Sequence, residues 1–225
     1  YYKEKDIKRD RTMKYVPSDA PEIDKWKEVT LVYTSALKQI CTRLEILNEE
    51  FQHVHKYNPI EHIKSRIKSP ESIVKKLKKR GLESTIENMV EHVNDIAGVR
   101  VICSFTSDIY RIAEMIANQN DITIISVKDY LKAPKESGYK SYHMIVSVPI
   151  FLSDKVVNAK VEIQIRTVAM DFWASLEHNL RYKQNNEGKM SDKVNMELKA
   201  CAEVSANLDR RMQKIFDEVK KFLLS

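Results

Sequence analysis

Residues 160–167, Lys-Val-Glu-Ile-Gln-Ile-Arg-Thr, constrain the fold of this chain more than any other segment. Apolar and polar residues alternate in it without interruption, which is the pattern of a β-strand with one buried face. Three aliphatic side chains would enter a core. The opposite face would present a carboxylate, an amide and a guanidinium, from Glu162, Gln164 and Arg166.

Two interpretations of this polar face are open. It is either the solvated side of an ordinary amphipathic strand or the lining of a cleft. In a cleft, Glu162 could bind a metal or accept a proton, and Arg166 could hold a phosphate.

Composition sets the class of protein. The chain has 225 residues, 43% hydrophobic and 31% charged, which predicts one large or two small globular domains. Three widely spaced cysteines favour reduced thiols over disulfides or a zinc site, and no apolar run approaches membrane-spanning length. We therefore expect a cytoplasmic protein without a membrane segment. Residues 1–20 are charged and aperiodic, so we expect a mobile N-terminal segment there.

Two long amphipathic helices are predicted towards the ends of the chain. Apolar residues recur at helical spacing from Ile23 to about Asn58, and again from Val194 to Phe222. The second stripe resembles a heptad seam. Packing within one chain is the favoured use of both stripes, and contact with a partner subunit is the alternative.

A shorter helix is predicted after Ser69. Ser69 is a natural N-cap, Pro70 suits the first turn, and Gly81 would close the helix. The middle of the chain predicts an α/β sheet, with strands over 97–105, 122–127, 139–148 and 159–167 and helices over 108–118 and 169–182.

The first candidate site residues surround the strand that begins at residue 97. Asp95 precedes this strand and could be a metal ligand or simply a turn former. Gly98 inside a strand indicates close approach of a ligand or another backbone. Arg100 projects among aliphatic residues, where it would favour an anion or a planar group.

A polar loop over residues 135–143 adds an aromatic group. Gly138 permits a turn that other residues resist, and Tyr139 beside it could offer a flat face to a nucleobase. Ser141 and His143 would share one face of the following strand.

Lysine and arginine crowd between His62 and Arg80, where Glu71 is the only acid. Lys68, Ser72 and Lys76 follow each other at four-residue steps, at the start of a helix whose free N–H groups favour phosphate. Most such runs are solvated surface. Together with Asp95 and Glu162, this one predicts a site in which Mg²⁺ bridges nucleotide phosphates.

These residues resemble a known family. Asp-Ile-Ala-Gly-Val-Arg (95–100), Gly-Tyr-Lys-Ser-Tyr-His (138–143) and Val-Glu-Ile-Gln-Ile-Arg-Thr (161–167) are similar to the signature blocks of the RelA/SpoT-type synthetase domain. Residues 170–178 resemble the following helix of its single-domain branch, the small alarmone synthetases.

The resemblance implies a nucleotidyltransferase-like mixed sheet of about five strands, flanked by helices. It implies a synthetase domain over residues 21–185 and a C-terminal helix over 186–225 for packing or oligomerisation. The implied reaction moves the β,γ-pyrophosphoryl group of ATP to the 3′-hydroxyl of GDP or GTP, giving ppGpp or pppGpp and AMP. It also implies a homotetramer, with Mg²⁺ as cofactor and no requirement for nucleic acid. No His-Asp dipeptide of the hydrolase domain occurs, so synthesis alone is expected.

Matching positions imply a role for each site residue. Asp95 would be the main Mg²⁺ ligand, and Glu162 would assist the metal or act as the base. ATP would be bound by Arg66, Lys68, Ser72, Lys76 and Arg100. The acceptor GDP or GTP would be bound by Lys135, Tyr139, His143, Gln164, Asp171 and Glu177. Asp171 departs from the asparagine of some relatives, so the choice between GDP and GTP stays open.

Two other functions are compatible with parts of the pattern. A nucleic-acid-binding protein would explain the basic segment but would leave Asp95 and Glu162 repelling phosphates. A catalytically silent nucleotide sensor or scaffold would use the long helices, although every expected catalytic position is filled.

Overall fold

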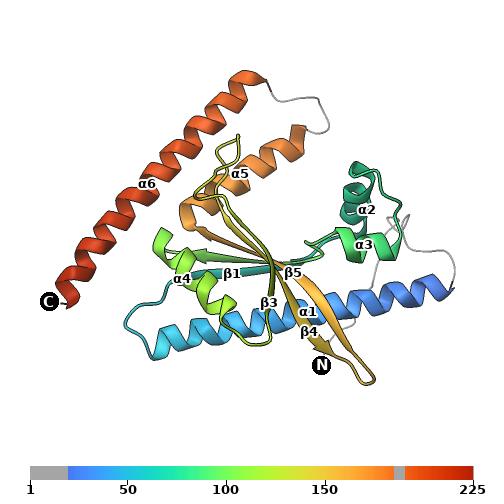
Figure 1. The fold of residues 1–225 in the computed structure, drawn as a ribbon. Coiled ribbons are helices and arrows are strands. Elements are labelled where there is room, and N and C mark those ends of the chain that lie inside the picture. The colour runs from blue at the N-terminus through green and yellow to red at the C-terminus, as the bar shows by residue number, and fades with distance from the viewer. Residues whose placement is uncertain (1–19, 185–190, 225) are drawn as a thin grey trace, which may run out of the picture.

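A computed structural model of the protein describes residues 20–184 and 191–224 (Figure 1). Helices and strands follow one another along the chain in this order: α1 (Ala20–His53), β1 (Ile60–Ile67), α2 (Pro70–Lys79), α3 (Ile86–His92), β2 (Ala97–Cys103), α4 (Thr106–Ala117), β3 (Thr123–Asp129), β4 (Tyr142–Phe151), β5 (Val156–Thr167), α5 (Val168–Gln184) and α6 (Asp192–Leu224). Most of the predicted mobile segment lies outside the described residues, and Ala20 already belongs to α1.

The five strands form one mixed sheet in the order β1-β2-β5-β4-β3. β2 and β5 run parallel, and the three other pairings are antiparallel. The expected mixed sheet of about five strands is therefore confirmed. β5 lies at its centre, which places its polar face between residues of β2 and β4.

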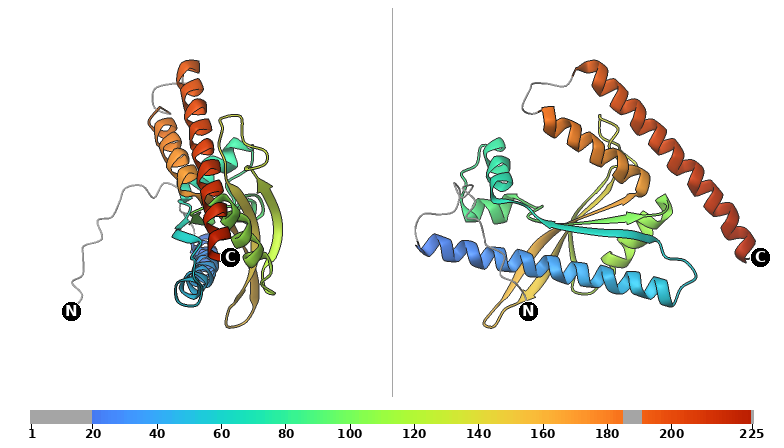
Figure 2. Two further views of the ribbon diagram at one scale, coloured as in Figure 1. Left: turned by 90° about the vertical axis from the view of Figure 1, so that its left-hand side faces the viewer. Right: turned by 180° about the vertical axis from the view of Figure 1, so that it is seen from behind.

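The alternation over residues 160–167 has the predicted consequence. Val161, Ile163 and Ile165 of β5 are fully buried and belong to the main core. Helices α1 and α4 and strands β2 and β4 supply most of the other residues of this core, and α1 crosses the sheet in the view from behind (Figure 2). The other face of β5 is thereby left for the polar side chains.

Helix α2 begins as its sequence predicts. The Ser69 hydroxyl accepts a hydrogen bond from the backbone N–H of Ser72 at 3.3 Å, and Pro70 occupies the first position. Gly81 has a φ of +72° just after the helix, a conformation that favours glycine. Ile73 and Leu77 are buried beneath it.

The ends of the predicted strands and of the helices over 108–118 and 169–182 shift by up to three residues; the strand predicted over 139–148, for example, is Tyr142–Phe151. Three further features differ from the sequence predictions. α1 ends at His53, before Asn58, and the Asn58 side chain instead accepts a hydrogen bond from the Ile60 backbone N–H at the start of β1. β1 and the short α3 were not predicted.

The third difference concerns α6. Along the predicted stripe, Val194, Leu208, Met212, Ile215 and Val219 are all exposed. The favoured interpretation, packing within one chain, is therefore wrong for most of this stripe, whereas the stripe of α1 is buried. Figures 1 and 2 show α6 standing away from the sheet, beside α5. No helix within residues 20–184 and 191–224 is both long and apolar enough to cross a membrane.

Candidate active site

The polar face of the sheet is hollowed by a cleft between β1, β2 and β5. Its lining includes Arg66, Gly98, Arg100, Glu162 and Gln164. Gly98 pairs with Arg66 on one side and with Glu162 on the other. A Cβ atom at Gly98 would lie 3.9 Å from the Arg66 side chain, so the glycine leaves the floor of the cleft open beside it.

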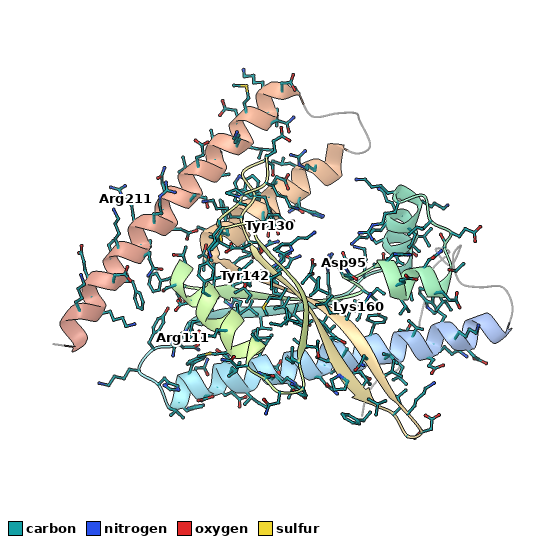
Figure 3. All side chains as sticks on the ribbon, in the orientation of Figure 1. Asp95, Arg111, Tyr130, Tyr142, Lys160 and Arg211 are labelled. Atoms are coloured by element: carbon teal, nitrogen blue, oxygen red, sulfur yellow. The ribbon has the colours of Figure 1, made fainter. Side chains whose placement is uncertain are left out.

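Asp95 lies beside α3 (Figure 3), near enough to the cleft for its charge to act on Glu162. Its two carboxylate oxygens accept hydrogen bonds from Lys68 at 2.8 Å and Lys76 at 2.7 Å. The backbone of Lys68 is fixed in turn by the Ile96 carbonyl at 2.8 Å. Burial alone would raise the pKa of the Asp95 carboxyl, but the two lysines outweigh it and hold this pKa below its ordinary value.

Glu162 occupies the middle of the cleft. One carboxylate oxygen lies 3.3 Å from Nδ1 of His143, and the other accepts a hydrogen bond from Gln164 at 2.8 Å. Burial would raise the pKa of Glu162. The hydrogen bond and charge of His143, with the Gln164 amide, more than offset this and keep the pKa low, while the negative charge of Asp95 opposes them. Glu162 is therefore ionised at neutral pH.

These two acids are suited to bind a divalent cation whose remaining ligands come from a substrate. Each carries a charge that acts on the other, and each sits at or beside a strand. Mg²⁺ is commonly held by one or two carboxylates together with substrate phosphates and water. In the described residues no cluster of three or more acidic, histidine or cysteine side chains could hold a metal without such help.

The loop between β3 and β4 supplies the aromatic surface. Tyr139 donates or accepts a hydrogen bond with Nε2 of His143 at 2.9 Å, and its ring lies 4.8 Å from Nζ of Lys135. The predicted acceptor residues Lys135, Tyr139, His143 and Gln164 are thus gathered at one edge of the cleft.

Arg166 has a different surrounding from the one that its sequence position suggested. The side chain is only 4% exposed, and it donates to Ser141, Gln164, Tyr139 and Asp171. With its donors directed at protein groups, it serves as a buried support for Tyr139 rather than as a free phosphate ligand.

Asp171, near the start of α5, contacts basic side chains from three strands, β1, β2 and β5. Its carboxylate lies 2.9 Å from Arg100, 3.3 Å from Arg166 and 3.3 Å from Lys64. Lys64 was not among the predicted site residues. Its signal was the two-residue step from Lys64 to Arg66, which places both on one face of a strand.

Two predicted site residues lie apart from this network. Ser72 is engaged at the N-terminus of α2, where its hydroxyl contacts that of Ser69 at 3.0 Å. Glu177 lies further along α5 and pairs with Arg181.

A sequence profile described as the region found in RelA / SpoT proteins matches residues 65–187, more than half of the chain. The chain belongs to the RelA/SpoT family. The match contains Asp95, Glu162 and every other predicted site residue, so the cleft lies inside the region that defines the family.

Individual relatives agree with this assignment. This RelA/SpoT family member is 48% identical over 88% of its length to the GTP pyrophosphokinase YwaC of Bacillus subtilis, of which it covers 93%. It is 34% identical over 87% of its length to the GTP pyrophosphokinase YjbM of the same organism, of which it covers 90%.

Solved structures show the same fold. The crystal structure of small alarmone synthetase 2 from B. subtilis superposes with a TM-score of 0.77 at 47% identity, covering 86% of this chain and 98% of that one. Small alarmone synthetase 1 from B. subtilis, bound to its product pppGpp, gives a TM-score of 0.80 at 34% identity, covering 87% and 98%. The same synthetase bound to AMPCPP gives 0.75 at 32% identity, covering 88% and 99%.

Proposed function

We propose that this protein is a GTP pyrophosphokinase that makes the alarmones ppGpp and pppGpp. It transfers the β,γ-pyrophosphoryl group of ATP to the 3′-hydroxyl of GDP or GTP and releases AMP. The observation that carries the proposal is the arrangement of the cleft. Ionised Glu162 lies between a lysine-paired carboxylate, Asp95, and an aromatic platform, Tyr139, in a chain 48% identical to a GTP pyrophosphokinase.

The donor half would bind ATP. Arg66 and Arg100 line the cleft and would hold the adenine between their planar guanidinium groups. Lys68 and Lys76 would leave Asp95 and bind the phosphates of ATP instead. Ser72, at the N-terminus of α2, would also bind these phosphates. Release of the two lysines would free the Asp95 carboxylate for a divalent cation.

We propose that this cation is Mg²⁺, held by Asp95 and Glu162. When bound, it would neutralise phosphate charge and polarise the transferred group. The protein itself contributes the two ligands and the surrounding lysine and arginine side chains, which position the phosphates for in-line transfer.

The acceptor half would bind GDP or GTP. Tyr139 would stack on the guanine, and Lys135, His143, Gln164, Asp171 and Glu177 would bind the rest of the nucleotide. Glu162 would accept the proton of the ribose 3′-hydroxyl. The ribose 3′-oxygen would then form the new bond to the β-phosphorus of ATP. The bond between the α- and β-phosphates breaks in the same step, and AMP leaves with the bridging oxygen. His143, 3.3 Å from Glu162, would keep this carboxylate ionised and oriented.

We also propose that the protein works as a homotetramer in the cytoplasm, where its substrates are present together. Support for an oligomer comes from an apolar groove of about 800 Å³ between α5 and α6. Its exposed side chains include Phe172, Val204, Leu208 and Met212. Such an area of exposed apolar surface is typical of a protein–protein contact. Replacing Leu208 with Glu should reduce the mass measured by light scattering during size-exclusion chromatography, and an unchanged mass would exclude this groove from the interface.

The position of a radioactive label tests the reaction. With ATP labelled at the γ-phosphate and unlabelled GTP, the label should appear in a guanosine pentaphosphate. With ATP labelled at the α-phosphate, it should appear in AMP alone. Label from the γ-phosphate found only in inorganic phosphate would indicate an ATPase and would refute the proposal. A nucleic-acid-binding function would instead appear as salt-dependent RNA binding that survives Asp95→Asn and Glu162→Gln.

A further inference from the structure

The loop that carries Tyr139 rests on the C-terminal helix. Gly138 has a φ of +86°, and a Cβ atom at this position would lie only 2.6 Å from Cβ of Ala202 in α6. The nearest backbone is also close, because the Lys199 carbonyl oxygen would be 3.8 Å away. The loop and α6 therefore approach each other with room for no more than a hydrogen atom at Gly138 and a methyl group at Ala202.

A small second core fixes this contact. Trp173 and Ala174 of α5 and Ala202 of α6 are buried together, and Tyr139 and Leu198 pack against them. The Trp173 indole donates a hydrogen bond to the Leu198 carbonyl at 2.9 Å, which locks α6 to α5 at this level. This core is separate from the one beneath the sheet.

The position of the Tyr139 backbone depends on that of Gly138, because both belong to one hydrogen-bonded turn. This turn is closed by two hydrogen bonds, from the Gly138 backbone to the Lys135 carbonyl at 2.8 Å and from the Lys135 backbone to the Tyr139 carbonyl at 3.1 Å. On the other side, the Tyr139 hydroxyl is held by Arg166 and His143. Tyr139 is thus fixed between the sheet and α6.

We infer that Ala202 is a positioning residue for the acceptor nucleotide: it sets the height of the Gly138 turn and so the plane of the Tyr139 ring on which guanine stacks. This inference rests on the proposed function, because it takes Tyr139 as the guanine platform. Helix α6 then acts in catalysis without touching either substrate. A larger side chain at Ala202 displaces the acceptor platform, while the ATP half of the cleft, built from β1, β2 and α2, keeps its geometry.

The first test is the substitution Ala202→Val. We expect KM for GTP to rise about tenfold or more, because a misplaced binding group of this kind has effects of that size, and KM for ATP to change by less than about twofold. Lys214→Val is the control, because Lys214 is exposed on the same helix, away from Gly138 and from the groove between α5 and α6, and loses a similar helix propensity. It should leave both KM values unchanged. Thermal unfolding of both variants establishes that they are folded.

The second test is a pair of compensating substitutions. Gly138→Ala should raise KM for GTP, both through strain at positive φ and through the contact with Ala202. Adding Ala202→Gly removes the methyl group that the new side chain meets, so the double variant should recover at least about threefold in KM for GTP. Strain at residue 138 remains in the double variant, so recovery should be partial.

The outcomes separate the two proposals. If the unmodified protein transfers no pyrophosphate from ATP to GTP, the proposed function fails. If it does, but Ala202→Val raises both KM values equally or behaves as Lys214→Val does, the positioning role fails alone. A double variant no better than Gly138→Ala would also overturn it.

Discussion

Asp95→Asn removes the charge that two lysines share, and its effect can be worked out from the contacts. The Asp95 side chain is 13% exposed and lies 2.8 and 2.7 Å from Lys68 and Lys76. Hydrogen bonds to charged groups contribute about 1.5–3 kcal/mol each. Asparagine retains one acceptor oxygen, and release from burial offsets part of the loss, so we expect a net loss of about 2–3 kcal/mol. For a domain of this size, that corresponds to a fall in melting temperature of about 4–12 °C.

The dependence on pH gives this prediction a second, independent readout. The pKa of Asp95 lies below its ordinary value of 3.8, so the stabilisation is fully present above pH 3.8. It is lost as the pH falls through the lower native-state pKa. The difference in unfolding free energy between the wild type and Asp95→Asn should therefore be constant near neutral pH and shrink in acid.

The assay is thermal unfolding followed by circular dichroism, without nucleotide or metal. Asp24→Asn is the control, since the pair between Asp24 and Lys27 is 74% and 71% exposed and should contribute less than about 1 kcal/mol. A melting temperature for Asp95→Asn within about 1 °C of the wild type would refute the reasoning. So would a difference in stability that does not shrink in acid.

Three further substitutions test other parts of the structure. Ser69→Ala removes the N-cap of α2 and should cost about 1 kcal/mol in urea unfolding; no change would mean that the cap is not stabilising. Arg66→Met removes a guanidinium beside the proposed adenine site, a cation–π contact of about 1–2 kcal/mol, so KM for ATP should rise about five- to thirtyfold while KM for GTP stays constant. Arg166→Leu leaves Asp171 paired with Arg100 and Lys64 but removes the buried donor that holds Ser141 and Tyr139, so it should cost about 1–3 kcal/mol in the same unfolding assay, and no measurable loss would contradict its supporting role.

The elements that the sequence predicted are those with complete local signals. β5 has strict alternation, and α2 has a cap, a proline and a closing glycine. β1 has neither an alternating pattern nor a capping signal. It is an edge strand in which only Ile60 is buried, and its charged residues resemble those of a solvent-exposed segment. α3 has only seven residues, too few to establish a period.

Periodicity also cannot tell what a helix packs against. α1 and α6 carry similar apolar stripes, yet Ile40 and Leu44 are buried by the sheet while Leu208 and Met212 are exposed. The difference depends on tertiary arrangement, which no local pattern contains.

The candidate site shows the same division. The residue types and their strand faces could be predicted, and Glu162, Gln164 and Arg166 do share one face. The three cations around Asp171 and the contact of Gly138 with Ala202 could not, because each joins segments tens of residues apart.

The central claim is that Glu162 acts in the transfer step and not in folding or in holding the nucleobases. It is tested most directly by measuring turnover of Glu162→Gln together with its affinities for ATP and GTP. We expect both dissociation constants to remain within about threefold of the wild type and turnover to fall by roughly a thousandfold or more, since the base and one metal ligand are lost together. Turnover within tenfold of the wild type, with binding intact, would contradict the account.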